Sequence, residues 1–525
     1  MKKQVYAATL LSAAIFLAAC EGDDGLNGTD GADGADGFNS LIAFRDIPKG
    51  DAACLGGGLA VDSGLDTNRN DVLDAAEVQS TEIVECAATP TIRALHASPD
   101  APAVNIWVNG APALTGVDYA QGSGFVPVVE ENNVQVEAII PGGNAIVIDA
   151  DVQLDYSTET TIIAVDNVAG PVRPLAITNP SDSRLTPGYF RAQVVHASPS
   201  APAVDVYVTT LGADLNGASP VNGAGTPLAY EDYTGQLEDP AGDYQIRITP
   251  AGDPDTVVVV SGEIPLAAGA DLMIVAVENT GPGATPVQLV VLDGTTASVL
   301  YDANTPASVV AAHLSPDAPA VDLLADINGT AVNEALPLVR NVSYNEFCDL
   351  NGIPAPGDYT VSVVANADNS IVAHTIPVNV MQGDEALAIV SGFLAAGDPV
   401  ITDITLPGNT RSVVTETKLR ITHASPSTPE VDLYLVADGT DINAVDPTFA
   451  AVPFGADTTQ LSIAPGIYDA YVTLAGSKAP AITLADLDFA GGEVLDVIAR
   501  DATGAETAPQ AVVIDYASVA ACPAP

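Results

Sequence analysis

Basic side chains are scarce in this 525-residue sequence. Its 16 Lys and Arg stand against 67 Asp and Glu, which gives a formal net charge of −51. Such a surface repels nucleic acid and anionic lipid headgroups, so neither is expected as a direct partner. It attracts cations and favours solubility at high salt, where screening relieves the self-repulsion.

Long apolar stretches are also rare. Beyond residue 19, no run reaches the roughly 18 uninterrupted apolar residues that suggest a membrane-spanning helix, which predicts soluble domains for the rest. Aromatic residues make up only 5% of the sequence and include one Trp. Apolar residues still reach 47%, which excludes wholesale disorder. Val, Ile and Thr runs broken by Gly and Pro predict short strands and turns.

The N-terminus has the pattern of an export signal. Lys2 and Lys3 precede an apolar run over residues 5–19, which ends in small residues before Cys20. The ending Leu-Ala-Ala-Cys resembles the bacterial lipoprotein lipobox, which implies a signal peptide over residues 1–19 and a lipid on Cys20. Glu21 is not the Asp that commonly retains lipoproteins at the inner membrane, so the resemblance implies the outer membrane. The alternative is an ordinary signal peptide with an incidental Cys.

Residues 20–40 are predicted to form an acidic tether. Glycine occupies every third position from Gly22 to Gly37, which is the collagen period. The segment is short and contains no Pro, which favours a flexible spacer over a triple helix.

Residues 41–90 are predicted to form a small calcium-binding module. In the stretch GLDTNRNDVLDAAEV, oxygen ligands have the spacing of a twelve-residue EF-hand loop. The predicted Ca²⁺ ligands are Asp66, Asn68, Asn70, the Val72 carbonyl, Asp74 and Glu77. Asp71 replaces the Gly of the sharp turn. Asp tolerates left-handed geometry better than most residues, so the loop is expected to survive with weaker affinity. The alternative is an acidic turn without metal.

Four cysteines suggest two disulfides. Cys54 and Cys86 flank the predicted loop and would staple a module too small for a large core. Cys348 and Cys522, if bridged, would pin the end of the chain to its third repeat. The alternative for the second pair is two free thiols.

One motif recurs four times, at intervals of 100, 117 and 110 residues. It reads H-x-S-P-x-x-P-x-V-[DN] and begins at His96, His196, His313 and His423. Each His ends a stretch in which every second residue is apolar, as in Ile92-Ala94-His96, so it is expected on the core face of a strand. The prolines then end that strand and turn the chain.

About seven short strands in each copy predict a β-sandwich. We therefore expect an all-β chain with a tandem array of four Ig-like or Greek-key β-sandwiches, at residues 91–187, 188–305, 306–411 and 412–525. The motif is similar to the hallmark of a bacterial extracytoplasmic family catalogued as a domain of unknown function (4397), typified by H-A-S-P-D-A-P-x-V-D-V. That resemblance implies an exported β-sandwich with no established activity. The tether and the D-x-N-x-N loop resemble modules that often precede such domains in envelope lipoproteins.

The His and Ser of the motif raise the question of catalysis. A triad requires a Ser hydroxyl within hydrogen-bond reach of an imidazole that a third group orients. In H-x-S-P the Ser begins a proline turn, where its hydroxyl more naturally caps that turn. A transition-metal site is disfavoured, because each copy offers one His and no nearby Cys. We therefore expect the imidazole to be buried and to hydrogen-bond turn carbonyls.

The strand after the motif carries an aromatic residue on its predicted outward face in three copies. These residues are Trp107, Tyr207 and Tyr434, and Leu324 takes their place in the third copy. Outward aromatics beside carboxylates could stack on sugar rings or contact a partner protein. The alternative is cover for the sheet face or packing between repeats.

The sequence thus predicts a calcium-stiffened, lipid-anchored envelope protein that is not an enzyme. Its repeats would serve for binding or spacing, with an extracellular glycan or an envelope protein as partner. One alternative is a carbohydrate- or matrix-binding adhesin that uses the outward aromatics. The other is an envelope hydrolase that uses the motif His and Ser.

Overall fold

A computed structural model describes residues 36–181, 184–327, 336–350, 353–354, 356–395, 397–504 and 506–523. The predicted signal peptide, Cys20 and most of the tether lie outside these residues. The chain divides into two compact units, Met1–Cys86 and Ala87–Pro525. We call the described part of the first the N-terminal module and the second the repeat unit. Within the described ranges there is no α-helix, so the all-β prediction is confirmed. No helix there is long and apolar enough to cross a membrane.

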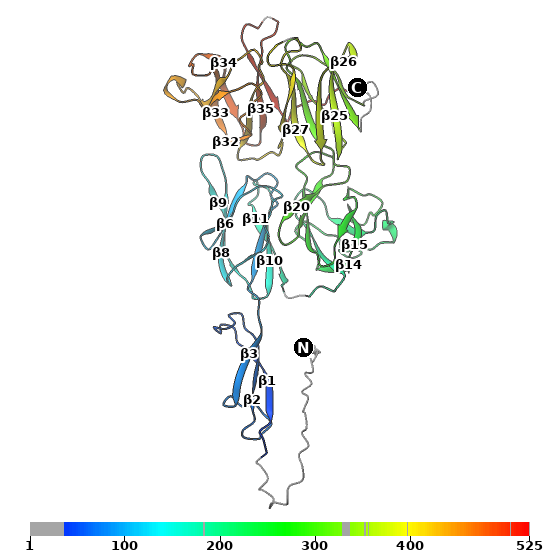
Figure 1. Cartoon of the computed structure of the whole chain (residues 1–525), viewed down its shortest axis with the longest axis vertical. Helices are drawn as coiled ribbons and strands as arrows, with labels where there is room; N and C mark the ends of the chain where they lie inside the picture. The colour runs from blue at the N-terminus through cyan, green and yellow to red at the C-terminus, as the bar shows by residue number, and fades with distance from the viewer. Residues whose placement is uncertain are drawn as a thin grey trace, which may run out of the picture. The chain divides into compact units, whose positions relative to one another are not determined.

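The N-terminal module is a three-stranded antiparallel sheet in the order β1-β2-β3 (Figure 1). Its strands are β1 (Ser40–Ile47), β2 (Gly58–Leu65) and β3 (Val78–Cys86). Its buried apolar cluster consists of Ile47, Cys54 and Ala60. Cys54 and Cys86 form a disulfide, as expected from the sequence. A sheet that buries so little apolar surface depends on such a covalent link for stability.

The repeat unit contains four β-sandwiches. Repeat 1 consists of β4 (Thr91–His96), β5 (Val104–Val108), β6 (Ala111–Val117), β7 (Val126–Pro127), β8 (Glu131–Ala138), β9 (Ala145–Gln153), β10 (Thr158–Val165) and β11 (Arg173–Pro180). Repeat 2 consists of β12 (Tyr189–His196), β13 (Val204–Thr209), the 3-10 helix η1 (Leu215–Gly217), β14 (Leu237–Pro240), β15 (Gly242–Pro250), β16 (Val259–Val260), β17 (Ile264–Leu266), β18 (Asp271–Glu278), β19 (Val287–Leu292) and β20 (Ala297–Leu300).

The second half of the unit follows the same plan. Repeat 3 consists of β21 (Ser308–His313), β22 (Val321–Ile327), β23 (Leu336–Val342), β24 (Phe347–Asp349), β25 (Gly357–Ala365), β26 (Asp368–Val380), β27 (Glu385–Ser391) and β28 (Thr402–Pro407). Repeat 4 consists of β29 (Thr417–His423), β30 (Val431–Ala437), the 3-10 helix η3 (Ile442–Ala444), β31 (Phe449–Val452), β32 (Leu461–Ile463), β33 (Gly466–Leu474), β34 (Pro480–Phe489), β35 (Val494–Arg500) and β36 (Gln510–Asp515). Each repeat therefore has more strands than the seven or so expected, since short edge strands such as β7 carry little sequence signal.

Each repeat has two sheets, and the motif marks the crossing from one to the other. In the first, which we call the motif sheet, the strand that ends in the motif His pairs in parallel with a late strand: β4 with β10, β12 with β18, β21 with β27 and β29 with β35. The strand after the motif lies in the second sheet, which we call the outer sheet, and pairs with antiparallel neighbours. The S-P-x-x-P turn makes the crossing because proline cannot continue a central strand.

The motif sheets pack together in pairs, so the four sandwiches form two double units. One apolar cluster joins residues of repeats 1 and 2: Leu95, Ile163, Val165, Val195, Val275 and Leu292. A second joins residues of repeats 3 and 4: Leu314, Ile389, Leu406, Ala424, Ile498 and Ile514. Figure 1 shows the strands of each pair side by side. As a result the motif strands are buried on both faces, and β29 is buried at every position.

The end of the chain returns from repeat 4 to repeat 3. The N–H of Cys522 donates to the carbonyl of Asp349 at 2.7 Å, and the N–H of Asp349 donates to Ala520 at 3.0 Å. Beside this contact Cys348 and Cys522 form a disulfide, which links residues 174 positions apart. The tail therefore ties together the two members of the second pair.

The segment before repeat 4 joins the two pairs. The guanidinium of Arg411 donates to the carbonyls of Ala101 at 2.8 Å and Pro99 at 3.1 Å, and it pairs with the carboxylate of Asp118. Arg411 therefore holds the motif turn of repeat 1 against repeat 4 with charge-assisted hydrogen bonds, which are stronger than neutral ones.

Candidate functional site

The motif histidine is held in the same way in all four copies. His96 Nε2 lies 3.0 Å from the carbonyl oxygen of Pro102, and the N–H of Ser98 lies 3.3 Å from Nδ1. The corresponding distances are 3.1 and 3.3 Å at His196, 3.1 and 3.4 Å at His313, and 3.1 and 3.4 Å at His423. A carbonyl only accepts and an amide N–H only donates, so the proton sits on Nε2 and the ring is neutral.

Burial reinforces this neutral state. The four imidazoles are only 1–2% exposed, and loss of hydration lowers the pKa of each ring below its ordinary value of 6.5. Carboxylates nearby oppose the shift without cancelling it: Asp118, Asp232, Glu346 and Asp501. Protonating any of these rings would also break the bond from the Ser N–H, because Nδ1 could no longer accept it.

The motif serine hydroxyls differ between copies. Ser315 Oγ donates to the carbonyl of Gly392 at 2.7 Å, and Ser425 Oγ bonds the carboxylate of Asp501. Both reach the end of the late parallel strand. The expectation that the hydroxyl caps its own proline turn is wrong for Ser315, whereas Ser425 Oγ also bonds Thr428 Oγ1 within its turn at 2.6 Å. The hydroxyls of Ser98 and Ser198 are buried without a hydrogen-bond partner. No hydrogen bond in the described ranges joins a motif Ser hydroxyl to an imidazole.

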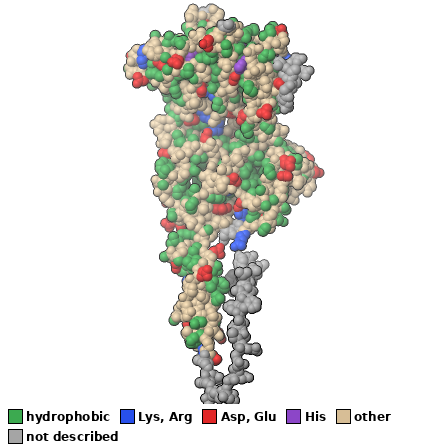
Figure 2. Space-filling model, viewed as in Figure 1, with side chains coloured by type: hydrophobic (Ala, Val, Ile, Leu, Met, Phe, Trp, Pro, Cys, Tyr) green, Lys and Arg blue, Asp and Glu red, His purple; other side chains and the backbone are tan. Residues whose placement is uncertain are grey.

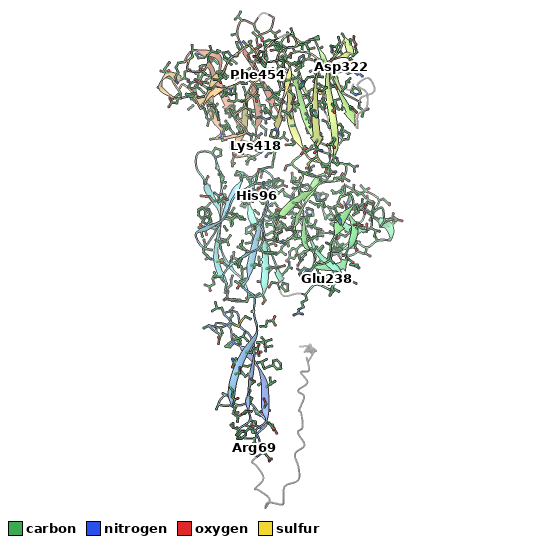
Figure 3. The ribbon with its side chains drawn as sticks, in the orientation of Figure 1. Arg69, His96, Glu238, Asp322, Lys418 and Phe454 are labelled. Atoms are coloured by element: carbon green, nitrogen blue, oxygen red, sulfur yellow. A yellow bond between two sulfur atoms is a disulfide. The ribbon has the colours of Figure 1, made fainter. Side chains whose placement is uncertain are left out.

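An aromatic ring covers each motif imidazole. Tyr119, Tyr230, Tyr344 and Phe454 meet the ring edge-on, with centroids 6.2–6.3 Å apart. His96 and Phe454 are labelled in Figure 3. The ring is buried or half-buried in every copy. These residues follow the motif His by 23, 34, 31 and 31 positions. The variable spacing explains why the motif alone did not predict them, whereas aligning the copies on D-Y, A-Y, S-Y and P-F would have done so.

Three of these aromatic residues also bond the neighbouring repeat. Tyr119 Oη donates to the carbonyl of Glu278 in repeat 2 at 2.6 Å, and Tyr230 Oη donates to Asp166 in repeat 1 at 2.6 Å. Tyr344 Oη donates to the carbonyl of Asp501 in repeat 4 at 2.7 Å. The contact between repeats 1 and 2 is thus reciprocal, like a two-fold interface. The motif, its aromatic cover and the pair interface form one continuous structure.

The acidic residue that follows the motif ties two hairpins together. Asp432 accepts from the N–H groups of Ala451 and Gly476, both at 2.8 Å. Asp205 likewise accepts from the amide of Asn222 at 2.9 Å and the N–H of Gly252 at 2.8 Å. Asp205, Asp322 and Asp432 are 1–5% exposed, so their carboxylates are committed to these turns.

Two of the three predicted outward aromatics are not exposed. Tyr207 is 4% and Tyr434 1% exposed, while Trp107 is half-buried. In repeats 2 and 4 the connection after this strand is longer and contains the helices η1 and η3, with buried residues Leu215 and Ile442. Lys478 bonds the carbonyl of Ile442 at 2.8 Å and lies 4.6 Å from the centre of the Tyr434 ring. In repeat 1 only Asn109 and Gly110 separate the two strands, so no such segment exists to cover Trp107.

The predicted calcium loop of the N-terminal module is compact. Asp66 is 1% and Glu77 6% exposed. Glu77 accepts from the Thr67 hydroxyl and N–H, both at 2.7 Å, and from the Asn68 N–H at 3.0 Å; these bonds lower the pKa of Glu77 and keep it charged. Asp66 accepts from the N–H groups of Asn70 and Asp71 at 3.0 and 2.9 Å.

The donor set of this loop suits calcium in type and in backbone shape. All the predicted ligands offer oxygen, which Ca²⁺ prefers. Asp71 has φ 58°, so it adopts the left-handed turn that Gly makes in an EF-hand. The amides of Asn68 and Asn70 both point nitrogen at Asp74, at 2.7 and 3.0 Å, and would have to turn their oxygens toward an ion. No group of three or more His, Cys, Asp or Glu within the described ranges is arranged to hold a metal.

Sequence reasoning also missed a basic site between repeats 1 and 4. Lys418, labelled in Figure 3, is 6% exposed and donates to Asn409 Oδ1 at 2.9 Å. Burial, together with the charge of Arg411, lowers the pKa of Lys418 to about 8. Asp118 and Glu416 also line this cleft of about 320 Å³. Figure 2 shows how rare basic side chains are on the visible surface by comparison with Asp and Glu.

Most of the chain matches the models of two protein families. A family model described as "Domain of unknown function (DUF4397)" matches residues 90–207, 216–324, 307–434 and 417–522. Another, described as "Domain of unknown function (DUF7151)", matches residues 39–85. The comparison with curated proteins gave no match.

Two solved structures show distant likeness. The Bacillus anthracis TIE protein is 11% identical, with 89% of this chain and 76% of that chain covered and a TM-score of 0.14. The family CBM26 module CBMbc from Eubacterium rectale Amy13K, in complex with maltoheptaose, is 10% identical, with 42% and 98% covered and a TM-score of 0.15. At these TM-scores neither likeness supports an inference about function.

Proposed function

Because this chain belongs to the family described as "Domain of unknown function (DUF4397)", with four copies between residues 90 and 522, we propose that it is a lipid-anchored cell-envelope protein whose repeats form a non-catalytic array for binding or spacing. The motif histidine supports this proposal most directly. In every copy its two ring nitrogens bond the backbone of its own turn, and the ring is 1–2% exposed. Such an imidazole has no nitrogen left for a substrate proton or a metal ion.

The two alternative functions have less support. A hydrolase would need a motif Ser hydroxyl bonded to the imidazole, and the hydrogen bonds described above run elsewhere. An adhesin would bind glycans through the aromatic residues of the strand after the motif. Tyr207 and Tyr434 are buried, so only Trp107 is accessible for such binding. Binding by the array therefore depends on other surfaces, such as the acidic exterior.

Cys20→Ser should release the chain from the membrane. A lipid on Cys20 would hold the protein in the membrane fraction until detergent is added, because stable anchoring depends on buried acyl chains. Fractionation of cells that express each form, followed by immunoblotting, measures the distribution. Cys522→Ser, which leaves the N-terminus unchanged, is the matched control and should stay with the membrane. A wild-type chain found mainly in the soluble fraction would contradict the anchor.

We further propose that Ca²⁺ binds the loop of the N-terminal module through Asp66, Asn68, Asn70, the Val72 carbonyl, Asp74 and Glu77. Calorimetric titration of the chain without residues 1–20 should show one binding site. Glu77→Gln should abolish it, because the bidentate carboxylate at the last loop position carries much of the affinity. At a hundred times its Kd, calcium should stabilise the module by about 2.7 kcal/mol.

Glu82→Gln provides the control for the calcium experiment. Glu82 lies in the same module but on β3, outside the loop, so its loss should leave the titration unchanged. Absence of heat and of thermal stabilisation with the unaltered chain would contradict the calcium proposal.

A further inference from the structure

The amine of Lys418 lies against the side-chain amide of Asn409. Asn409 belongs to the segment that follows β28, and Lys418 lies on β29, so the two residues span the junction between repeats 3 and 4. Lys418 Nζ is 2.9 Å from Asn409 Oδ1. Because a carbonyl bond is about 1.23 Å long, Nζ lies at most about 4.1 Å from Asn409 Cγ. A nucleophile and the carbon that it attacks approach to about 3–3.5 Å before they react, so this pair needs only a small movement.

The surroundings of Lys418 favour its nucleophilic form. The residue is only 6% exposed. Burial and the charge of Arg411 lower the pKa of Lys418 to about 8, although the carboxylates of Asp118, Glu416 and Glu385 act in the opposite direction. About a tenth of the amine is therefore neutral at pH 7 and carries the lone pair that a nucleophile requires.

The amide of Asn409 is held and polarised. The backbone N–H of Arg411 donates to the same Oδ1 at 3.2 Å. A donor at this oxygen stabilises the negative charge that would develop on it when an amine adds to Cγ. The amide of Gln460 also donates to the backbone carbonyl of Asn409 at 3.1 Å, which fixes the position of the residue.

Glu416 supplies a carboxyl group beside this pair. It precedes Lys418 by two positions, is 6% exposed and lines the same cleft as Asn409. Burial raises the pKa of Glu416, while Lys418 and Arg411 oppose this shift. A carboxyl group whose pKa is raised toward the working pH both takes up and releases a proton more readily.

We propose that Lys418 and Asn409 become joined by an intramolecular isopeptide bond. Lys418 Nζ adds to Asn409 Cγ, and Glu416 accepts a proton from Nζ and delivers it to Nδ2. The bond between Cγ and Nδ2 then breaks, and ammonia leaves. One amine and one primary amide thus become one secondary amide and ammonia, so the reaction needs no oxidant, reductant or cofactor. This bond is independent of the envelope function proposed above.

The bond would lock the segment that connects three repeats. Arg411 lies between the two joined residues, and its guanidinium bonds the carbonyls of Pro99 and Ala101 in the motif turn of repeat 1. A covalent link from Asn409 to Lys418 closes this segment into a loop that cannot extend. Arg411 would therefore stay in place when force or heat pulls the repeats apart.

Peptide mapping of the purified full chain by mass spectrometry tests this proposal. After reduction of the disulfides, trypsin cleaves after Arg411, so Asn409 and Lys418 would fall on separate peptides without the bond. The unaltered chain should instead yield residues 341–411 joined to residues 412–420. The joined species should be lighter than its two peptides together by about 17 Da, the mass of the ammonia that leaves.

Three variants complete the experiment. Lys418→Arg keeps the positive charge but cannot form the bond, and Glu416→Gln keeps the shape but cannot transfer the proton, so both should yield separate peptides. Formation of the Cys348–Cys522 disulfide confirms that each variant folds. Lys478→Arg is the matched control, because Lys478 lies in the same repeat and donates to the backbone carbonyl of Ile442. It should keep the joined peptide.

The outcomes that contradict the bond are distinct. Separate peptides of full mass from the folded, unaltered chain would overturn it. Separate peptides with a loss of about 17 Da at Asn409 would also overturn it, because they indicate a succinimide formed by that residue alone. A joined peptide that persists in Lys418→Arg would exclude Lys418 as the nucleophile, and one that persists in Glu416→Gln would overturn the role of Glu416.

Discussion

Acidification from about pH 7 to about pH 5 is expected to destabilise the repeat unit steeply. The folded chain keeps its four motif histidines neutral, because burial lowers their pKa below the ordinary 6.5. The unfolded chain takes up protons on those rings once the pH falls below 6.5. Stability is therefore complete above 6.5 and is lost as the pH drops toward the lower folded pKa. Each ring contributes up to about 1.4 kcal/mol per pH unit, so the four rings together contribute up to about 5.5 kcal/mol per pH unit.

The buried carboxyl groups do not reverse this loss of stability between about pH 7 and pH 5. Burial raises the pKa of Glu159 and of Glu416 above the ordinary 4.5, so in the folded chain these two gain protons earlier and oppose the loss. In the unfolded chain both carboxyl groups titrate near pH 4.5, well below the pH of about 6.5 at which the unfolded histidines take up protons. The net effect between pH 6.5 and their own titration should follow the histidines.

Trp107 makes the acid effect measurable in one repeat. It is the only Trp in the chain and lies on β5 of repeat 1, so its fluorescence during urea unfolding reports the repeat that contains His96. His96→Gln should lower stability and flatten the pH dependence by up to about 1.4 kcal/mol per pH unit. His374→Gln, outside the motif, should leave it unchanged. An unfolding free energy that stays constant between about pH 7 and pH 5 would show that burial does not hold these rings neutral.

Removing the disulfide of the tail should have the other large effect. Replacing Cys348 and Cys522 by Ser frees a link that spans 174 positions. The chain-entropy relation gives about 5 kcal/mol for a loop of that length, with typical measured losses of about 2–4 kcal/mol. The unfolding free energy of repeats 3 and 4, measured by urea denaturation followed by circular dichroism, should fall by this amount. Amide exchange at Asp349 and Cys522 should rise in parallel, since their N–H bonds hold the tail.

The other disulfide provides a matched control. Replacing Cys54 and Cys86 by Ser removes a shorter link of 32 positions in a separate compact unit. That change should destabilise the N-terminal module and leave the unfolding of the repeat unit unaltered. If the Cys348 and Cys522 replacements left the repeat unit equally stable, the tail contact would contribute little to it.

The sequence was sufficient for the all-β fold and for the four-fold repetition. Alternation such as Ile92-Ala94-His96 correctly placed the histidine on a buried strand face. It did not predict that the opposite face is buried as well, because pairing between repeats depends on contacts far apart in sequence. The run AQVVH before the second motif was a usable signal, since strands buried on both faces read as nearly continuous apolar runs.

The candidate site was less predictable. Tyr207 and Tyr434 alternate with core residues, so they were placed outward, but segments inserted after their strands cover them. Tyr119 and its counterparts were missed because the loops between them and the motif differ in length. Arg411 lies in the segment before repeat 4 and Lys418 lies on β29, and the contacts of both residues form only when repeat 1 and repeat 4 come together.

Pairing through the motif sheets restricts how such a chain can vary in length. Deleting repeat 2 alone would expose Leu95, Ile163 and Val165 of repeat 1. Exposure of this apolar patch to water is unfavourable and would promote aggregation. Deleting repeats 1 and 2 together uncovers no such patch from this interface. Viable relatives built on this plan should therefore gain or lose sandwiches two at a time, and a chain with an odd number would need a second molecule to complete its last couple.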